Sequence, residues 1–518
     1  MSSAHRDYRL PLILVVALIL RIGLALQGGQ FFLGDEGRYQ RGAAIYQAGR
    51  TGDWAAVAEQ LMKPEHAAFN YLNVAVAALQ HALAQFTTRG DWSQEVNIYT
   101  SANLAAALLS LFSVLNIWLL HRLARAGGAG EDEALWAALL MAASNTLFYY
   151  SRHLLPYDCA LSAALGGLIL AVSGRTRAHH RWSGGLAALA YQFYNGYWFL
   201  VPVVFLALQI SRPDWRTRWQ ALGPWAVGWL AAMFVNILPG ATCGGAQYWE
   251  TMLGFSGSVL QGVFAEGWSL AGEYLWHSEG WLGVTVVAAA GYSLGPAFRP
   301  GANSARLRRW LFLLSAVYLL PVLASVGLEK FVVYARTGRP LIPFLCLLGG
   351  FGLHTLATRQ PRSRPWLVGF IVAGSALSFA PHFGRIYPRE FGFRVLQQYG
   401  MTKNWVSFTG TIYQPLLIPV SRPDLVLINA GNIYPVRGFY GYPAGERLLS
   451  VDHPLSYLPY QYEGHTPRER RLLRQYPPLL QLVRLAHPAS VPNHPLPETL
   501  FKAEDRAGGY DRVPSPGR

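Results

Sequence analysis

Long apolar runs recur along the chain from Leu10 to Ala380, and short polar stretches separate them. A helix needs about 20 mainly apolar residues to cross the hydrocarbon core of a membrane. The runs therefore predict an α-helical polytopic membrane protein with about 11 transmembrane helices. We place these spans at residues 10–27, 99–120, 133–151, 157–173, 183–194, 196–210, 220–238, 281–297, 310–327, 340–357 and 366–380. Residues 183–210 would also fit one bent span followed by a re-entrant segment.

Clusters of arginine occupy alternate connections between the apolar runs. They comprise Arg122 and Arg125; Arg175, Arg177 and Arg181; Arg212, Arg216 and Arg218; Arg299, Arg306, Arg308 and Arg309; and Arg359, Arg362 and Arg364. Cytoplasmic loops of membrane proteins carry an excess of Arg and Lys. With a cytoplasmic N-terminus, every cluster falls on the cytoplasmic side. We therefore expect a multi-pass protein of the cytoplasmic (inner) membrane.

Residues 67–86 are long enough for a further span, which would reverse the side of every later arginine cluster. However, Asn70, Asn73, Gln80 and His81 fall on one face of the helix that this segment predicts. A polar stripe beside an apolar face is typical of a helix that lies in the membrane interface. We therefore expect this helix on the outer surface of the membrane.

Two polar pieces before residue 380 fall on the outer side. Residues 28–98 predict a first outer loop with interfacial helices, in which Tyr39, Ala43 and Tyr46 share one helical face. We expect these three side chains to seat their helix on the membrane. Residues 239–280 predict a second large outer loop.

The third outer piece follows the transmembrane domain of residues 1–380. Residues 423–436 read as a buried strand with flanking turn residues, and residues 466–476 read as a helix with a Thr cap. We expect a small extracytoplasmic α/β domain over 381–485. The Pro-rich tail at 486–518 is expected to be disordered.

Composition supports a membrane protein and narrows the partners. The chain has 518 residues, of which 52% are hydrophobic, and a net charge of +15. A nucleic-acid-binding protein gathers such charge on one patch, whereas here it is divided among short loops, so we expect no nucleic-acid partner. Cys159, Cys243 and Cys346 show neither metal-ligand nor disulfide spacing.

Ionisable residues at the outer ends of the spans are the candidates for chemistry, because charges at membrane depth are costly. In this threading they are Asp35, Glu36, Arg38, Lys63, Glu65, His66, Arg152, His153, Asp158, Glu266, Glu273, Lys330, Arg336 and Arg339. Arg21 can reach the same face by snorkelling. Acids, bases and aromatic residues thus converge on one membrane face, which suits an anionic, amphipathic substrate.

Each candidate also has a purely structural interpretation. Asp35 and Glu36 could cap the helix that follows them. Arg152 and Asp158 could form a structural ion pair at a helix–helix turn. The later cations could be ordinary interfacial anchors.

The order of these features resembles the GT-C class of membrane glycosyltransferases, which includes protein O-mannosyltransferases and lipid A aminoarabinose transferases. The resemblance covers about residues 10–380. It is carried by Arg21 in the first span, by the Asp35–Glu36 pair with Tyr39 shortly after it, by the Lys63–Pro64 step, by the "YYSRHLLPYD" hairpin within 134–172, and by "YARTGRPLIPFLCLLGGFGL" at 334–353.

The resemblance implies transfer of a sugar from a polyprenyl-phosphate carrier to an acceptor on the outer face of the membrane. Asp35 matches the catalytic acid of the first outer loop and would act as general base, with inversion at the anomeric carbon. Glu36 would share a proton or orient the acceptor, with Tyr39 beside the substrate. Asp158 matches the second carboxylate, which would hold a sugar hydroxyl or a metal.

A phosphate leaving group needs cations. The candidates are Lys63, Arg152, Lys330, Arg336 and Arg339. The need for a divalent metal stays open, and Glu65, His66 and Asp158 are the residues that could hold one.

The chain also departs from the family pattern. Met62 stands where the aminoarabinose enzymes carry an acid, and Tyr194-Asn195-Gly196 replaces a Thr-Lys-Gly that contains a cation. Two other functions stay open, a lipid or glycan transporter (flippase) and a non-catalytic membrane scaffold. A transporter should carry ionisable groups near the bilayer midplane and paired halves.

Overall fold

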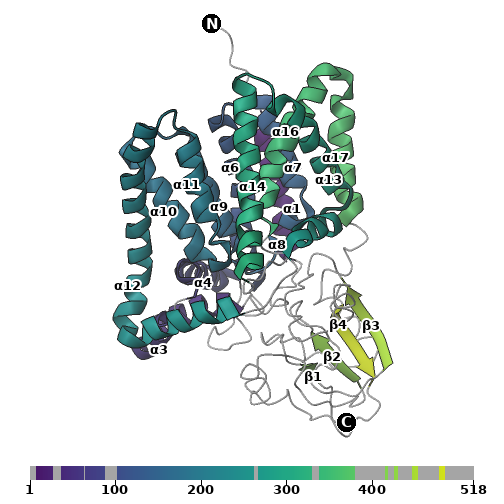
Figure 1. Cartoon of the computed structure of the whole chain (residues 1–518). Coiled ribbons are helices and arrows are strands. Elements are labelled where there is room, and N and C mark those ends of the chain that lie inside the picture. The colour runs from purple at the N-terminus through teal and green to yellow at the C-terminus, as the bar shows by residue number, and fades with distance from the viewer. Residues whose placement is uncertain are drawn as a thin grey trace.

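The computed structural model describes residues 8–26, 37–63, 65–87, 102–261, 267–328 and 338–379, together with four strands near the C-terminus. Most of the described chain is a bundle of helices (Figure 1). Its helices are α1 (Arg9–Leu26), α6 (Ala102–Ala126), α7 (Glu131–Ala143), α8 (Asn145–Tyr150), α9 (Tyr157–Ser173), α10 (Arg177–Phe193), α11 (Leu200–Ile210), α12 (Trp215–Gln261), α13 (Gly267–Ala297), α14 (Ala302–Leu328), α16 (Leu341–Arg359) and α17 (Arg364–Phe379). Every predicted span overlaps one of these helices.

Four helical stretches in the described chain are long and apolar enough to cross a membrane: Ala105–Ala126, Trp215–Gly254, Ala302–Ala324 and Leu341–Arg359. Three shorter apolar stretches accompany them: Tyr157–Ser173, Asn195–Ile210 and Leu282–Ala297. The chain is therefore a multi-pass membrane protein, and the count of eleven spans stays a prediction. Residues 183–210 form two helices, α10 and α11, joined by the short 3-10 helix η2 (Asn195–Tyr197).

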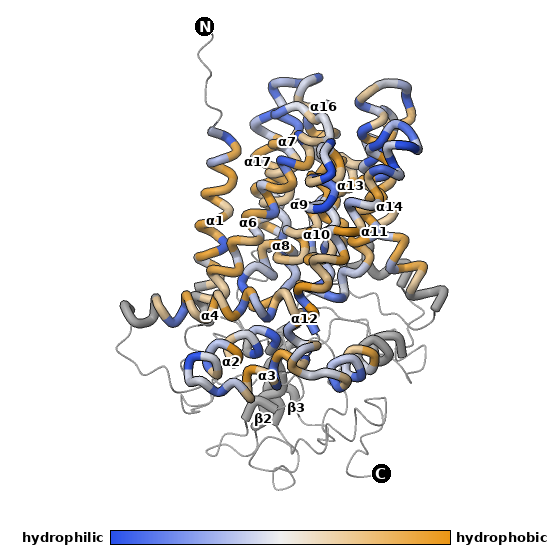
Figure 2. The backbone as a smooth tube through the Cα atoms, turned by 90° about the vertical axis from the view of Figure 1, so that its left-hand side faces the viewer, coloured by the Kyte–Doolittle hydropathy of each residue, from blue (hydrophilic) through white to orange (hydrophobic). Residues whose placement is uncertain are grey.

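The hydrophilic connections between the helices gather at one end of the bundle, where α1 also begins (Figure 2). At that end Arg9 of α1 and Arg364 of α17 both donate to Asp132 of α7, at 2.6 and 3.3 Å. Arg306 of α14 donates to the buried Glu133 at 2.9 Å. The predicted order of spans requires the basic loops to lie at one end of the bundle. The side of the membrane on which they lie stays a prediction.

The predicted outer loop at 239–280 is largely helical. α12 continues past residue 239 to Gln261, and α13 begins at Gly267. Each contains one left-handed residue, Gly245 (φ +51°) or Gly280 (φ +54°), at which the helix bends. The segment of α12 after Gly245 and the segment of α13 before Gly280 run across the end of the bundle (Figure 1). Glycine adopts a positive φ without the steric cost that a Cβ atom brings.

Three helices of the first outer loop lie at the end of the bundle opposite the basic loops (Figure 2). They are α2 (Gly37–Thr51), α3 (Trp54–Leu61) and α4 (Ala67–Thr87). α4 covers the predicted interfacial segment and runs across the bundle, but its polar stripe does not face water. Asn70, Asn73, Gln80 and His81 are all buried.

The cover over that stripe is α2. The hydroxyl group of Tyr39 donates to Gln80, the ring of Tyr46 lies 5.9 Å from that of His81, and Ala43 is buried between the helices. A Cβ atom on Gly42 would lie 2.8 Å from the carbonyl oxygen of Asn70, so only glycine permits this approach. The expectation that Tyr39 and its neighbours seat α2 on the membrane is therefore wrong, because they seat it on α4.

The four C-terminal strands form one antiparallel sheet in the order β1-β2-β4-β3. They are β1 (Pro415–Leu417), β2 (Leu425–Asn429), β3 (Glu446–Asp452) and β4 (Pro478–Arg484). β2 lies inside the predicted strand at 423–436. The predicted helix at 466–476 and the predicted disordered tail at 486–518 lie outside the described residues.

Candidate functional site

A buried ion pair marks the end of the bundle at which α9 and α16 begin. Asp158 lies in the first turn of α9, and Arg339 precedes Pro340, the N-cap of α16. Their side chains meet at 2.9 Å, and the residues are only 6% and 1% exposed. A carboxylate this deeply buried needs a partner, since an isolated buried charge is strongly unfavourable. The first turn of a helix also favours a negative charge.

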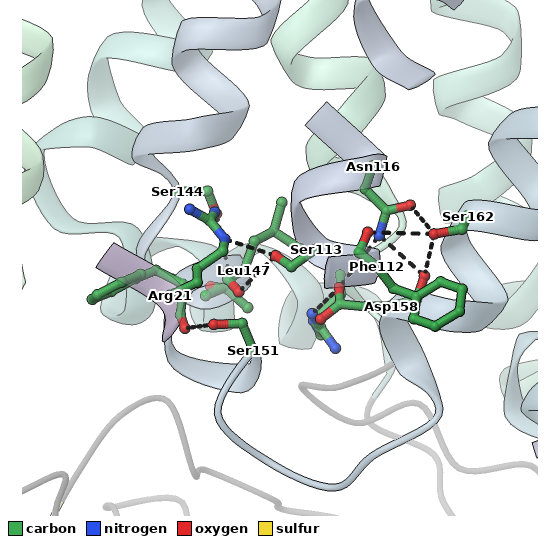
Figure 3. A network of polar contacts seen from close by, with 12 residues as sticks. Arg21, Phe112, Ser113, Asn116, Ser144, Leu147, Ser151, Asp158 and Ser162 are labelled. Carbon is green, nitrogen blue, oxygen red and sulfur yellow. Dashed lines mark hydrogen bonds and ion pairs between the residues drawn. The ribbon is translucent and has the colours of Figure 1, made fainter. Parts of the chain in front are cut away.

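Helix α6 holds Asp158 from the other side (Figure 3). The amide of Asn116 donates to the backbone oxygen of Asp158 at 3.0 Å and to its carboxylate at 3.5 Å. The hydroxyl group of Ser162 donates to Asn116 Oδ1 at 2.7 Å, or to the backbone oxygen of Asp158 at 2.9 Å. These contacts fix the carboxylate relative to α6 and α9.

Arg21 reaches the same face of α6. Its Nε donates to Ser113 at 2.9 Å, and Ser113 lies one helical turn before Asn116 (Figure 3). Its other nitrogens lie near the carbonyl oxygens of Ala17 and Ala142, at 3.4 Å each. The expectation that Arg21 snorkels to the outer face is wrong, because these acceptors hold the guanidinium group inside the bundle, where it is 1% exposed.

Aromatic rings surround the two arginines of this end. The guanidinium group of Arg339 lies 4.8 Å from the ring centre of Tyr150 and 5.3 Å from that of Tyr157. Arg152 is fully buried, 5.0 Å from the ring centre of Tyr149. Such cation–ring contacts favour a cation, the more so in a desolvated place. We call Arg21, Arg152, Asp158 and Arg339 with these three tyrosines the cation–tyrosine site.

The structure thus brings Arg339 to the hairpin that carries Arg152 and Asp158, so the three residues come from two separate parts of the chain. Among the described residues, the ion-pair partner of Asp158 is Arg339 and not Arg152. Among the described residues, Arg21, Arg152 and Arg339 place three guanidinium groups at this site, together with the one carboxylate of Asp158. A buried site with that composition suits a ligand that carries negative charge.

The first outer loop joins this end through His66, which precedes α4. The backbone N–H of His66 donates to Asn195 Oδ1 at 3.2 Å, and the backbone N–H of Asn195 donates to His66 Nδ1 at 3.4 Å. The His66 ring stacks on Tyr194 at 5.4 Å, and Tyr194 packs edge-on against Tyr157 at 4.7 Å. His66 therefore connects the first outer loop to the cation–tyrosine site through two rings.

The unusual Tyr194-Asn195-Gly196 motif acquires a role in this arrangement. Asn195 bonds His66, and the guanidinium group of Arg38, from α2, lies 5.9 Å from the ring centre of Tyr194. A cation from another helix thus stands near the motif that lacks one in its own sequence. The sequence had indicated only that Arg38 is one of the ionisable residues of the outer face.

Burial and the nearby Arg38 and Arg41 lower the pKa of His66 well below its ordinary value. The folded protein then keeps His66 neutral while the unfolded chain protonates it, so stability falls as pH drops below about 6.5. We expect the melting temperature to fall between pH 7 and pH 5, and His66→Asn to reduce that fall. Asn tolerates the positive φ of this position (φ 54°) and can accept from Asn195. An unchanged pH dependence in the variant would contradict this assignment.

The other predicted site residues lie elsewhere. Lys63, which follows the end of α3, donates to Gln60 at 3.1 Å and lies 3.8 Å from Glu59, both on α3, so these contacts do not place it in the cation–tyrosine site. Tyr39 is fully buried between α2 and α4, and this position gives no support for a substrate contact. Asp35, Glu36, Pro64, Glu266, Lys330 and Arg336 lie outside the described residues.

The residues named for a metal do not fit one in the described part of the chain. Glu65 pairs with Arg41 at 3.4 Å, the Nδ1 atom of His66 accepts from Asn195, and Asp158 pairs with Arg339. No three His, Cys, Asp or Glu side chains gather among the described residues. We therefore derive no step through a metal.

Glu279 of α13 is a buried carboxylate that the sequence analysis missed. It accepts from the hydroxyl group of Ser144 at 2.8 Å and from the backbone N–H groups of Asn145 and Thr146, at 2.8 and 3.1 Å. These donors begin α8, and α8 carries Tyr149 and Tyr150 to Arg152 and Arg339. Glu279 therefore acts as a positioning residue for the cation–tyrosine site.

Replacing Glu279 by alanine would leave two buried N–H groups without their acceptor, at a cost of about 1–3 kcal/mol each. We expect a lower melting temperature and, in the protein that stays folded, a lower kcat with little change in KM. Glu279→Gln keeps one acceptor oxygen and should lose less. Ser375→Ala removes only a hydroxyl donor to Asn145 and Ala143 and is the matched control. If it lowers kcat as much as Glu279→Ala, the positioning role is wrong.

Comparison with known proteins gives limited information. No family model and no curated protein matches the chain. Among solved structures it is similar to the archaeal oligosaccharyltransferase AglB from Archaeoglobus fulgidus, solved in complex with an inhibitory peptide and a dolichol-phosphate. That similarity has a TM-score of 0.41 and 13% identity, and it covers 72% of this chain and 54% of the AglB chain. The chain thus spans about half the length of AglB, and its function has to be inferred from its own residues.

Proposed function

We propose that this protein is a membrane glycosyltransferase that takes its sugar from a polyprenyl-phosphate donor. The observation that carries the proposal is the cation–tyrosine site at one end of an apolar bundle. A polyprenyl-phosphate sugar has an apolar tail that belongs in the membrane and an anionic head that belongs at its surface. Buried guanidinium groups bind phosphate oxygens strongly, and tyrosines suit the boundary between apolar and polar surroundings.

The reaction is a direct displacement at the anomeric carbon. An acceptor hydroxyl or amine attacks that carbon, its bond to the phosphate oxygen breaks, and the polyprenyl phosphate leaves with the electron pair. The proton of the acceptor passes to Asp35, the general base, while Glu36 orients the acceptor. The product has inverted configuration. This assignment of Asp35 and Glu36 rests on the sequence motif that they share with GT-C enzymes.

Arg339 and Arg152 stabilise the negative charge that develops on the leaving phosphate, together with Lys330 and Arg336. Asp158 holds Arg339 in place and accepts from a sugar hydroxyl. The bond between them fixes the guanidinium group before the donor arrives, and preorganised charges of this kind cost no rearrangement during the reaction.

The acceptor is a component of the cell envelope, either a lipid, a glycan or a protein, on the outer face of the cytoplasmic membrane. The extracytoplasmic segment at 381–485, which contains the four strands, is our candidate for its binding. The alternative functions are a lipid or glycan flippase and a non-catalytic scaffold.

One reconstitution tests these functions together. Purified protein in vesicles is supplied with polyprenyl-phosphate sugars, and sugar transfer to a cell-envelope extract is followed with hydrolysis of the donor. A glycosyltransferase releases polyprenyl phosphate in step with transfer. Movement of intact donor across the vesicle membrane with no release of polyprenyl phosphate would instead establish the flippase. If the protein shows neither activity, the scaffold is the remaining function.

A further inference from the structure

An apolar slot of about 360 Å³ lies between α7, α13 and α16, and its lining contains none of the arginines or tyrosines of the cation–tyrosine site. Leu140 of α7 and Ile342 of α16 form two of its walls, and Val284, Val287 and Ala288 of α13 form the third. The volume is within the range of about 300–1,000 Å³ that is usual for sites of small molecules. A space of this size can hold part of a ligand.

Glycine positions explain why the helices separate at this level. Near the basic end, Gly352 of α16 packs on the backbone of Ala289, and a Cβ atom on Gly350 would lie 2.8 Å from the backbone nitrogen of Ala137. α13 and α7 are thus in close contact with α16 there. At Gly280 the axis of α13 bends. The slot begins beside the close contact and extends past the bend, where Leu275 and Glu279 line it.

The polar side chains that line the slot already have hydrogen-bond partners within the protein. Apart from the thiol group of Cys346, the polar side chains that line it are those of Ser144 and Glu279. They bond one another at 2.8 Å, and Glu279 also accepts from two backbone N–H groups at the start of α8. A carboxylate with three donors needs no cation from a ligand. The rest of the lining is apolar.

The slot opens through an apolar and exposed part of α13. Val284 and Val287, which line it, are also 36% and 54% exposed on the outside of the bundle. They lie in the apolar stretch Leu282–Ala297, and Ile342 lies in a candidate span, Leu341–Arg359. The molecules that meet this opening in a membrane are hydrocarbon chains, and water is scarce there.

We propose that the slot binds one hydrocarbon chain of a membrane phospholipid, which enters between Val284 and Val287 and ends near the Ser144–Glu279 pair. The apolar lining, the satisfied carboxylate and the exposed apolar opening favour this occupant over a charged or hydrogen-bonding one. The proposal does not depend on glycosyl transfer, because it concerns lipid binding alone.

The experiment uses the full chain in nanodiscs that contain a phospholipid with a diazirine near the end of one acyl chain. After irradiation, labelled peptides are mapped by mass spectrometry. We expect labelling to concentrate in Leu282–Ala288 and Leu341–Cys346. Val287→Phe and Ala288→Phe fill the opening and should lower this labelling by about tenfold, the equivalent of ~1.4 kcal/mol in binding.

Val227→Phe is the matched control, since Val227 of α12 is also 54% exposed and lies outside the slot. It should leave the labelling at the parent level. The Phe variants must also elute and melt as the parent does, and because two positions are tested, one misfolded variant does not decide the outcome. Labelling spread evenly over all exposed helices, or labelling that both folded Phe variants leave unchanged, would overturn the proposal.

Discussion

Arg339→Ala is expected to lower sugar transfer by about 10²–10³ and to lower the thermal stability of the protein as well. The first effect follows from the loss of a preorganised cation at the leaving phosphate. The second follows from the position of Asp158, which is 6% exposed and would lose its ion-pair partner at 2.9 Å. Breaking a buried ion pair costs about 3–5 kcal/mol when one charge is left behind.

A double variant separates these two effects. Asp158→Asn removes the buried charge that Arg339→Ala leaves behind, so the combination should recover part of the lost stability, with a coupling of about 0.5–3 kcal/mol. It should not recover transfer, because the cation that the phosphate needs is still absent. Melting temperature and transfer rate, measured on the two single variants and the double variant, give both quantities. Recovery of transfer in the double variant would assign the pair to structure alone.

The other end of the bundle offers a matched ion pair. Arg306 and Glu133 meet at 2.9 Å, and both are buried to a similar degree, at 6% and 7% exposed. Arg306→Ala should therefore destabilise the protein about as much as Arg339→Ala. It should leave the transfer rate per folded molecule unchanged, because Arg306 is at the basic end, far from the cation–tyrosine site along the bundle. Equal losses of transfer in the two variants would contradict our placement of the site.

The hydrophobic pattern predicted the helices of the bundle well, since long apolar runs have few alternatives in a membrane protein. Charge predicted that the basic loops share one end. It also predicted that Arg152, Asp158 and Arg339 lie at the opposite end, although 181 residues separate Asp158 from Arg339. Counting the spans is enough for that prediction, because each span carries the chain from one side of the membrane to the other. Which cation pairs with Asp158 depends on side-chain packing, which the threading does not specify.

Residues whose role depends on tertiary contacts could not be predicted. The polar stripe of α4 has the same sequence pattern whether water or another helix covers it. Gly42 of α2, which permits the close approach of the two helices, was the missed indication that a helix covers it. Glu279 lies in a segment that reads as an outer loop, so nothing in the pattern suggested that it holds the start of α8. His66 and Asn195 are 129 residues apart, and their mutual bonds have no signature in either local sequence.

Asp35→Asn is expected to lower the transfer rate by about 10²–10⁴, the usual contribution of a positioned general base. Asparagine keeps the size of the side chain and much of its capacity to cap a helix, but it cannot accept the proton of the acceptor. The loss should therefore fall on kcat, with donor binding retained. The measurement is transfer of a radiolabelled sugar from the polyprenyl-phosphate donor at saturating acceptor, with Asp35→Ala beside it.

Asp53→Asn is the matched control, because Asp53 is an acid of the same outer loop and caps α3 by accepting from Ala56 N–H at 3.0 Å. Asn caps a helix about as well as Asp, so the control should transfer sugar at the parent rate. If Asp35→Asn matches it, capping explains Asp35 and another residue is the base. If Asp35→Asn and Asp35→Ala are equally slow while Asp53→Asn is normal, the missing proton acceptor is the cause, since only one of the two Asp35 variants can still cap.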